Sequence, residues 1–194
     1  MRTSDEDHRD VLYYKPAGKT RYSKKHDITP FKQGIFDTAC SLYAAINLIG
    51  LNLKLQGQDL DYEDGQAIYD AILEDLDGGK WLARLVDGRG IRKSRWRKIV
   101  ESACTNASEI MDAQFTAEWH KDVKDEAGLL GLLRQDQPVS LMTKVDDGLR
   151  HYTVLTGFDK DVFRLFDSSV YKRLPRKSDQ LFIAKGTVVT INVS

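Results

Sequence analysis

The hydrophobic pattern of this chain changes at Pro138, and that change constrains the fold more than any other feature of the sequence. Before Pro138, apolar residues recur at helical spacing. After it, short runs rich in β-branched and aromatic residues alternate with turn sequences. Helices gathered in the first part and strands gathered in the second are typical of an α+β fold. Short turns between successive strands predict an antiparallel sheet.

The expected elements follow from this pattern. Helices are expected over residues 39–49, 61–76, 94–103 and 125–134, and strands over residues 139–143, 151–158, 162–167, 180–184 and 187–193. Asp37 or Thr38 is the expected cap of the first helix, and Gly50 its expected end. This helix is apolar on most of its surface, which places it in the middle of the domain.

The first 30 residues differ from the rest of the chain. They are polar and interrupted by Pro16 and Pro30, which predicts an arm without a helix or strand. Residues 31–194 are expected to form a single domain, since a chain of 194 residues can bury one sizeable core. With 41% hydrophobic and 30% charged residues, the composition indicates a globular protein.

Charge and hydropathy exclude several classes of partner. The 29 basic and 29 acidic residues cancel, so no overall field attracts nucleic acid or an anionic membrane, and the basic cluster at residues 92–98 is expected to be a solvated helix face. No apolar run approaches the roughly 20 residues that span a bilayer, and residues 1–10 lack a signal-peptide segment. We therefore expect cytoplasmic synthesis. Delivery to another cell as a bacterial effector stays open, as does the oligomeric state.

Cys40 is the candidate nucleophile. The chain has two cysteines, Cys40 and Cys104, and in a reducing cytosol both are expected to be free thiols. Cys40 stands where the central helix is expected to begin, and unpaired N–H groups and the helix dipole favour a thiolate there. The same N–H groups can stabilise an oxyanion. Cys104 has no histidine pattern around it and is expected in the core.

His151 is the candidate general base. Of the four histidines, two lie in the polar arm and one in a charged stretch, whereas His151 opens an apolar strand. Asp167 ends the next expected strand, and the sequence at residues 159–161 predicts a hairpin turn between the two. The hairpin is expected to bring Asp167 beside His151 without any adjustment of the strand register. Asp167 would then orient the imidazole, as a nucleophile–base–orienter triad requires.

Gln33 adds a fourth residue to this set. It lies seven positions before Cys40, where a side-chain amide can donate a second hydrogen bond to an oxyanion. The matching segments are residues 33–41 (QGIFDTACS), 151–158 (HYTVLTGF) and 166–169 (FDSS). Their order resembles the papain-like cysteine peptidase superfamily, and is closest to the bacterial branch containing the bacteriocin leader peptidases. The Cys-Gly-Ser-Cys-Trp signature of plant and lysosomal enzymes is absent.

The resemblance covers about residues 33–49 and 138–170. It implies a papain-like fold in which a helical N-terminal half, with the cysteine on its central helix, packs on a C-terminal antiparallel sheet. It also implies a thiol peptidase that hydrolyses an amide bond in a peptide or protein through Cys40, His151, Asp167 and Gln33. No cofactor is expected, and no pair of His or Cys residues has the spacing of metal ligands.

Two alternatives remain open from the sequence. The same acyl-enzyme can pass its acyl group to an amine, as in transglutaminase-like enzymes, because the intermediate is shared. The chain can also be a non-catalytic papain-like module that binds a partner. Neither the substrate nor the cleavage specificity follows from the sequence, because the arm and the middle helices match nothing in the resemblance.

Overall fold

A computed structural model gives the architecture of the chain. It describes residues 12–13, 25–26, 30–31, 39–76, 93–144, 150–168, 173–176 and 181–194. Within these ranges the chain forms four helices, a six-stranded antiparallel sheet and a separate two-stranded pair. The α+β class expected from the change of pattern at Pro138 is therefore confirmed.

The helices are α1 (Cys40–Leu55), α2 (Tyr62–Asp75), α4 (Lys93–Met111) and α5 (Glu126–Leu133). The strand order of the large sheet is β3-β8-β4-β5-β6-β7. Its strands are β3 (Phe115–Trp119), β4 (Val139–Lys144), β5 (Arg150–Phe158), β6 (Val162–Phe166), β7 (Arg173–Pro175) and β8 (Val189–Val193). The separate pair joins β1 (Leu12–Tyr13) to β2 (Lys25–His26).

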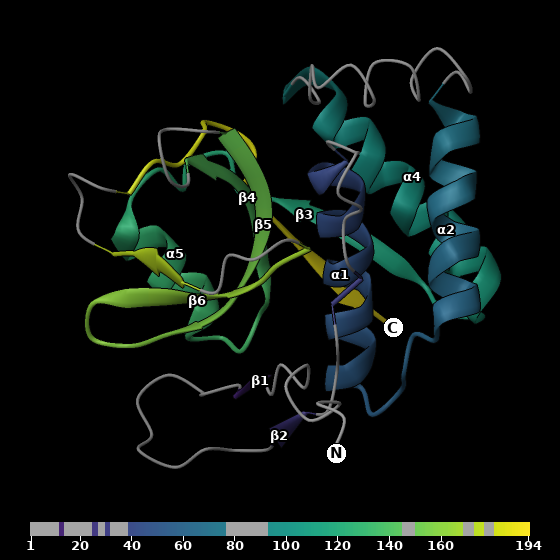
Figure 1. Ribbon diagram of the computed structural model, residues 1–194, viewed down its shortest axis with the longest axis horizontal. Helices are drawn as coiled ribbons and strands as arrows, with labels where there is room; N and C mark the ends of the chain where they lie inside the picture. The colour runs from purple at the N-terminus through teal and green to yellow at the C-terminus, as the bar shows by residue number, and fades with distance from the viewer. Residues whose placement is uncertain are drawn as a thin grey trace, which may run out of the picture.

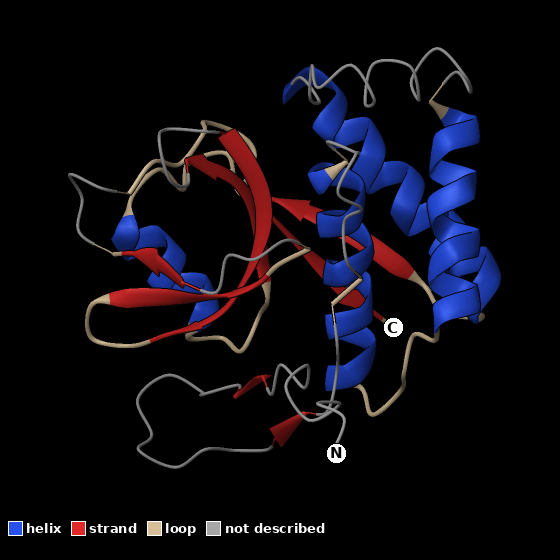
Figure 2. Cartoon of the chain, viewed as in Figure 1, coloured by secondary structure: helices blue, strands red, loops and turns tan. Residues whose placement is uncertain are grey.

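The helix α1 lies between the sheet and the helices α2 and α4, and the sheet curves around α5 on its other side (Figure 1). Figure 2 shows the same arrangement with the helices and the strands in separate colours. The side chains of the central strands alternate between two cores. Tyr152 and Val154 of β5 pack with α1 and α4, whereas Leu155 packs with α5. Helices therefore cover both faces of β5.

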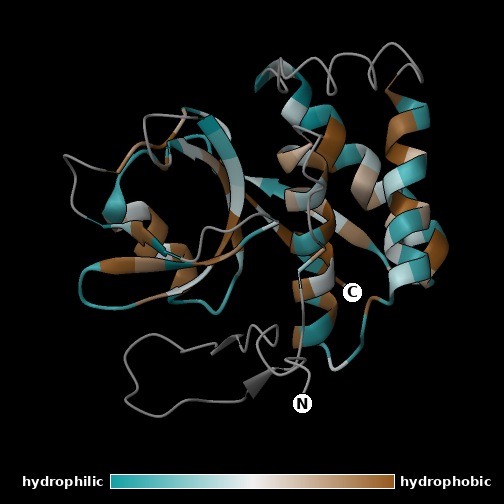
Figure 3. Ribbon diagram, viewed as in Figure 1, coloured by the Kyte–Doolittle hydropathy of each residue, from teal (hydrophilic) through white to brown (hydrophobic). Residues whose placement is uncertain are grey.

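Burial explains the length of α1. Gly50, expected to end this helix, is instead a buried residue in its interior, and the helix continues to Leu55. The apolar side chains of Leu51 and Leu53 follow and are buried, so packing outweighs the cost of about 1 kcal/mol that an interior glycine brings. Figure 3 shows the apolar residues of this helix.

The expected cap of α1 is also wrong. The residue at the N-cap position is Ala39, and no side chain makes a capping hydrogen bond there. Asp37 and Thr38 themselves lie outside the described residues. By contrast, the Asp61 carboxylate accepts from the Asp64 N–H at 2.8 Å and so caps α2.

The third expected helix, over residues 94–103, is too short. The helix α4 runs from Lys93 to Met111, because buried residues continue to recur at helical spacing through Cys104 and Ala107. Its Trp96 is fully buried and donates through Nε1 to the Thr187 carbonyl at 2.8 Å, which ties α4 to the segment before β8. The fourth expected helix agrees with α5, which Asp125 caps by accepting from the Gly128 N–H at 2.9 Å.

Two expectations about strands are corrected, and one strand was not expected at all. The sequence did not suggest β3, whose polar residues face outward while Phe115 is buried and which pairs with β8 along its whole length. Residues 181–184 form no strand. Isolated hydrogen bonds hold them beside β4, such as the one that the Ala184 N–H donates to the Met142 carbonyl at 3.0 Å. The arm, expected to lack strands, contains β1 and β2. None of the described helices is both long enough and apolar enough to cross a bilayer.

Candidate active site

Cys40 is the first residue of α1 and is partly buried. Each helix begins with N–H groups that have no partner within the helix. In α2 and α5 an aspartate side chain takes one of them, but Ala39 has no side chain that could do so. The first turn of α1 also contains no acidic residue, so no carboxylate there opposes a thiolate. The start of α1 is therefore suited to hold negative charge.

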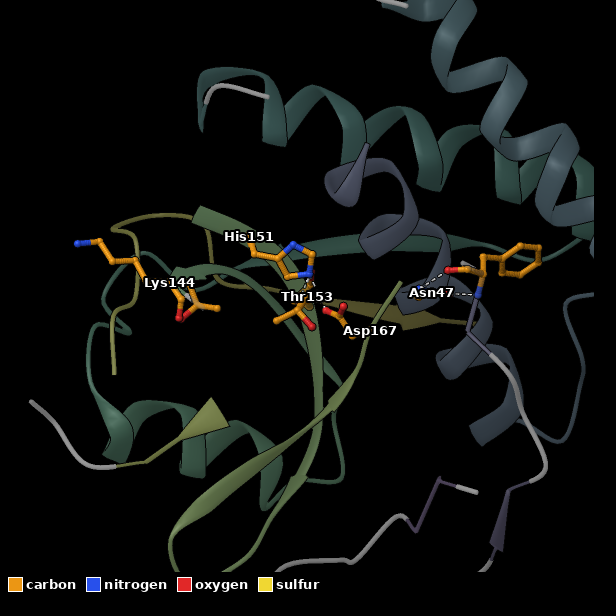
Figure 4. A network of polar contacts seen from close by, with 8 residues as sticks. Asn47, Lys144, His151, Thr153 and Asp167 are labelled. Atoms are coloured by element: carbon orange, nitrogen blue, oxygen red, sulfur yellow. Dashed lines mark hydrogen bonds and ion pairs between the residues drawn. The ribbon is translucent and has the colours of Figure 1, made fainter. Parts of the chain in front are cut away.

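His151 and Asp167 lie in contact, and both are almost fully buried. Nε2 of His151 and Oδ2 of Asp167 are 2.8 Å apart, and the residues are 5% and 4% exposed (Figure 4). The Cys40 side chain hydrogen-bonds to the same imidazole. Because Nε2 faces the carboxylate, Nδ1 is the nitrogen left for the thiol. Three of the four residues expected at the site are thus brought together, while Gln33 lies outside the described residues.

A β-bulge puts Asp167 on the same sheet face as His151. Next to the hairpin turn Phe158 pairs with Phe163, and in that register Asp167 would come opposite Val154, on the face away from His151. The register shifts between Leu155 and Gly157, where β5 has one residue more than β6. Beyond this bulge Val154 pairs with Phe166, so Asp167 follows opposite Thr153.

The shifted register corrects an expectation from the sequence. The hairpin turn lies where it was expected, closed by the Asp159 N–H donating to the Val162 carbonyl at 2.8 Å. Contact between His151 and Asp167 does, however, require a specific register. The extra residue is Thr156, which is 1% exposed. Because side chains alternate between the two faces of a strand, a bulge that shifts the pairing by one residue is enough to move Asp167 to the face of His151.

The surroundings of His151 make it a strong base. Burial lowers the pKa of the imidazole, but hydrogen bonds to Asp167 and to Cys40, together with their negative charges, outweigh burial and raise the pKa from 6.5 to about 9. The ring therefore carries a proton at neutral pH. A proton held between a thiol and a carboxylate is the state from which a cysteine nucleophile acts.

The second cysteine differs in every respect. Cys104 is 5% exposed in α4, and burial, followed by the charge of Glu101, raises the pKa of its thiol to about 12. A thiol with so high a pKa stays protonated and unreactive at neutral pH. This environment agrees with the core position expected for Cys104.

Tyr152 is a neighbour of the site that the sequence did not single out. Its ring packs against Trp96 with centroids 4.6 Å apart, and its hydroxyl is buried without a hydrogen-bond partner. Burial, followed by the negative charge of Cys40, raises the pKa of the phenol. The Tyr152 phenol therefore stays neutral at neutral pH.

The donor set of the site suits acid–base and nucleophilic chemistry. Across the described ranges, no group of three His, Cys, Asp or Glu side chains is arranged to hold a metal ion. The site itself combines a thiol, an imidazole and a carboxylate, in contact through the imidazole.

No family model matches the chain, and no curated protein matches it. Among solved structures, the chain is similar to the peptidase domain of Streptococcus ComA, a bi-functional ABC transporter involved in a quorum sensing pathway. The sequence identity is 14%, the match covers 84% of this chain and 96% of that domain, and the TM-score is 0.46. A similarity at this identity and TM-score assigns no roles to residues of this chain.

Inserting one alanine after Thr156 tests the role of the register. With one residue still absorbed by the bulge, the insertion brings Asp167 opposite Val154 and turns it away from His151, so the imidazole loses the bond that raises its pKa. The pKa of His151, measured by NMR titration of the ring, should fall markedly. Deletion of Thr156 is the matched control, because it removes only the extra residue of β5, leaves Thr153 opposite Asp167 and should leave the pKa nearly unchanged. An unchanged titration in the insertion variant would refute this role.

The two cysteines are expected to differ in reactivity. Iodoacetamide at neutral pH should alkylate Cys40 at least about a hundredfold faster than Cys104, because the thiol of Cys104 is buried and has a raised pKa. Peptide mapping of the native protein over time measures both rates. Comparable rates at the two positions would contradict the assignment of Cys40 as the activated thiol.

Proposed function

We propose that this chain is a papain-like cysteine peptidase that hydrolyses an amide bond in a peptide or protein. Cys40 is the nucleophile, His151 the general base and acid, and Asp167 the residue that orients the imidazole. Gln33 is assigned as a second donor to the oxyanion, beside the first N–H groups of α1. The bacterial branch containing the bacteriocin leader peptidases is the proposed place of the chain within the superfamily.

One observation carries the proposal. A single buried imidazole contacts a carboxylate through Nε2 at 2.8 Å and hydrogen-bonds to a thiol at the start of a helix. A structural histidine needs a partner for its ring nitrogens, but it does not need a thiol at an uncapped helix N-terminus. Nucleophilic catalysis needs each of these parts in this order.

The reaction starts from a thiolate–imidazolium pair, in which the Sγ proton of Cys40 is already on Nδ1 of His151. The thiolate adds to the substrate carbonyl carbon, and the N–H groups of α1 and the Gln33 amide stabilise the oxyanion. The imidazolium then gives its proton to the departing amine as the C–N bond breaks, which leaves an acyl-enzyme. Water, deprotonated by His151, attacks the acyl carbon, and the thiol is regenerated as the acid leaves.

A peptide electrophile should trap the nucleophile. A peptidyl chloromethyl ketone should add one mass equivalent at Cys40, and Cys40→Ala should take up none while remaining folded, because alanine preserves the start of α1. Intact-mass analysis with peptide mapping locates the adduct. His151→Ala should slow the addition by about 10²–10⁴-fold, the range of general acid–base catalysis. Full turnover by Cys40→Ala would refute the mechanism. Amine added in competition with water would reveal acyl transfer.

The activity is expected to decline as the pH rises through about 9. Above that pH, His151 loses the proton that the leaving amine needs, so kcat/KM should follow an alkaline limb set by the pKa of His151. Asp167→Ala should shift this limb to lower pH, because burial of the ring then acts without the carboxylate. Asp167→Asn, which keeps a hydrogen bond but no charge, should shift it less. A limb that stays in place in Asp167→Ala would contradict the orienting role.

Stability provides an independent control on the same group. Because folding raises the pKa of His151 from 6.5 to about 9, its stabilising contribution is complete below pH 6.5 and is lost as the pH rises through about 9. The loss of unfolding free energy in Asp167→Ala should therefore be larger at pH 6 than at pH 10. Urea denaturation at the two pH values measures this difference.

A further inference from the structure

Asn47 holds a distant part of the chain by its backbone. This residue lies in the middle of α1 and is 1% exposed. Its Oδ1 accepts from the Phe31 N–H at 2.7 Å, and its Nδ2 donates to the Phe31 carbonyl at 3.3 Å (Figure 4). One side-chain amide therefore binds both backbone groups of Phe31, as a neighbouring strand would. We call this pair of hydrogen bonds the Asn47 clamp.

The ring of Phe31 is fixed as well. It lies so close to Gly65 of α2 that a Cβ at this position would be 2.1 Å from Cζ of the ring. It also stacks on Tyr62 with ring centroids 6.3 Å apart. A glycine inside a helix costs about 0.5–1 kcal/mol relative to alanine, and the close approach of this ring accounts for its presence.

The clamp lies on the same side of α1 as Cys40. Asn47 follows Cys40 by seven residues, which is two helical turns, or about 10 Å along the axis. Phe31 is attached to α1 at Asn47, and Ala39 is the N-cap of the same helix. Phe31 and Ala39, the described residues on either side of positions 32–38, are thus both held by α1. Gln33, the proposed oxyanion donor, follows the clamped residue by two positions.

The clamp is more than a way to satisfy a buried amide. Asn52, on the same helix, is 8% exposed, and its Nδ2 donates to the Leu48 carbonyl at 2.7 Å within α1. The helix can therefore accommodate a buried asparagine locally. Asn47 instead binds a residue 16 positions earlier in the chain, at the entrance to the segment that leads to the nucleophile.

From these contacts we infer that Asn47 is a positioning residue of the peptidase, which acts by fixing Phe31 so that Gln33 reaches the oxyanion. The inference rests on the proposed function. The effect of Asn47 is confined to reaction steps in which an oxyanion forms. The thiol and the imidazole belong to α1 and β5 and do not depend on the clamp, so the nucleophilicity of Cys40 is unaffected by it.

Two reagents separate these steps at the same sulfur atom. Acylation by the p-nitrophenyl ester of an N-acylated amino acid passes through an oxyanion, whereas displacement of iodide from iodoacetamide does not. Both rates at Cys40 are measured by intact mass in Asn47→Leu, which keeps the side-chain volume and removes both hydrogen bonds. Asn52→Leu is the matched control, because it removes another buried amide from the same helix.

We expect Asn47→Leu to slow acylation at least about tenfold, since a small displacement of a catalytic group can cost that much, and to change alkylation less than twofold. Asn52→Leu should change the ratio of the two rates less than twofold. Gln33→Ala alone should slow acylation by about 10²-fold, the cost of one oxyanion donor, and adding Asn47→Leu to it should slow acylation no further.

The outcomes distinguish the inference from the proposed function. If the ester does not acylate Cys40 of the unaltered protein, the peptidase proposal fails, and the role of Asn47 fails with it. If the ester does acylate Cys40, two results overturn only the role of Asn47. One is an equal ratio of acylation rate to alkylation rate in Asn47→Leu and in the unaltered protein. The other is a further slowing of acylation when Asn47→Leu is added to Gln33→Ala. Should Asn47→Leu not fold, Gly65→Ala replaces it. The added Cβ displaces the Phe31 ring and should lower the ratio of acylation rate to alkylation rate. Alanine has a higher helix propensity than glycine, so a lower ratio would not come from a weakened α2.

Discussion

The packing of α1 against β5 is the contact on which the site depends. Cys40 begins α1, His151 lies near the start of β5, and the side chains between these two elements form one continuous core. Groups on packed helices and strands keep their geometry better than groups on loops. Helices on both faces of β5 hold it in place, so the distance between Cys40 and His151, the proposed nucleophile and base, is set by the core.

Burial alone would act against the chemistry of this site. An imidazole removed from water loses basicity, and a carboxylate removed from water gains a proton unless it is paired. His151 and Asp167 oppose each of these tendencies in the other, because the charged form of one stabilises the charged form of its partner. The result is a proton held beside a thiol in a place where water competes little for it.

Much of this arrangement could be predicted because it is local in the sequence. The hairpin turn at residues 159–161 and the apolar helix after Cys40 follow from residue types a few positions apart, and both agree with the structure. The bulge at Thr156 could not be predicted, because packing on two faces of β5 decides where an extra residue fits. The continuation of α1 past Gly50 and the contact of Asn47 with Phe31 depend on partners distant in the sequence, and no local pattern encodes them.

The start of α1 has no side-chain cap, and the burial of Ala39 bears on that difference from α2 and α5. An aspartate or serine at an exposed N-cap contributes about 1 kcal/mol to its helix, as the aspartates before α2 and α5 can do for theirs. In place of the fully buried Ala39, such a residue would lose its hydration, and in the proposed reaction it would also occupy an N–H group that the oxyanion needs. Directed evolution at residue 39 would therefore retain a small apolar residue, whether the screen selects thermostability or turnover.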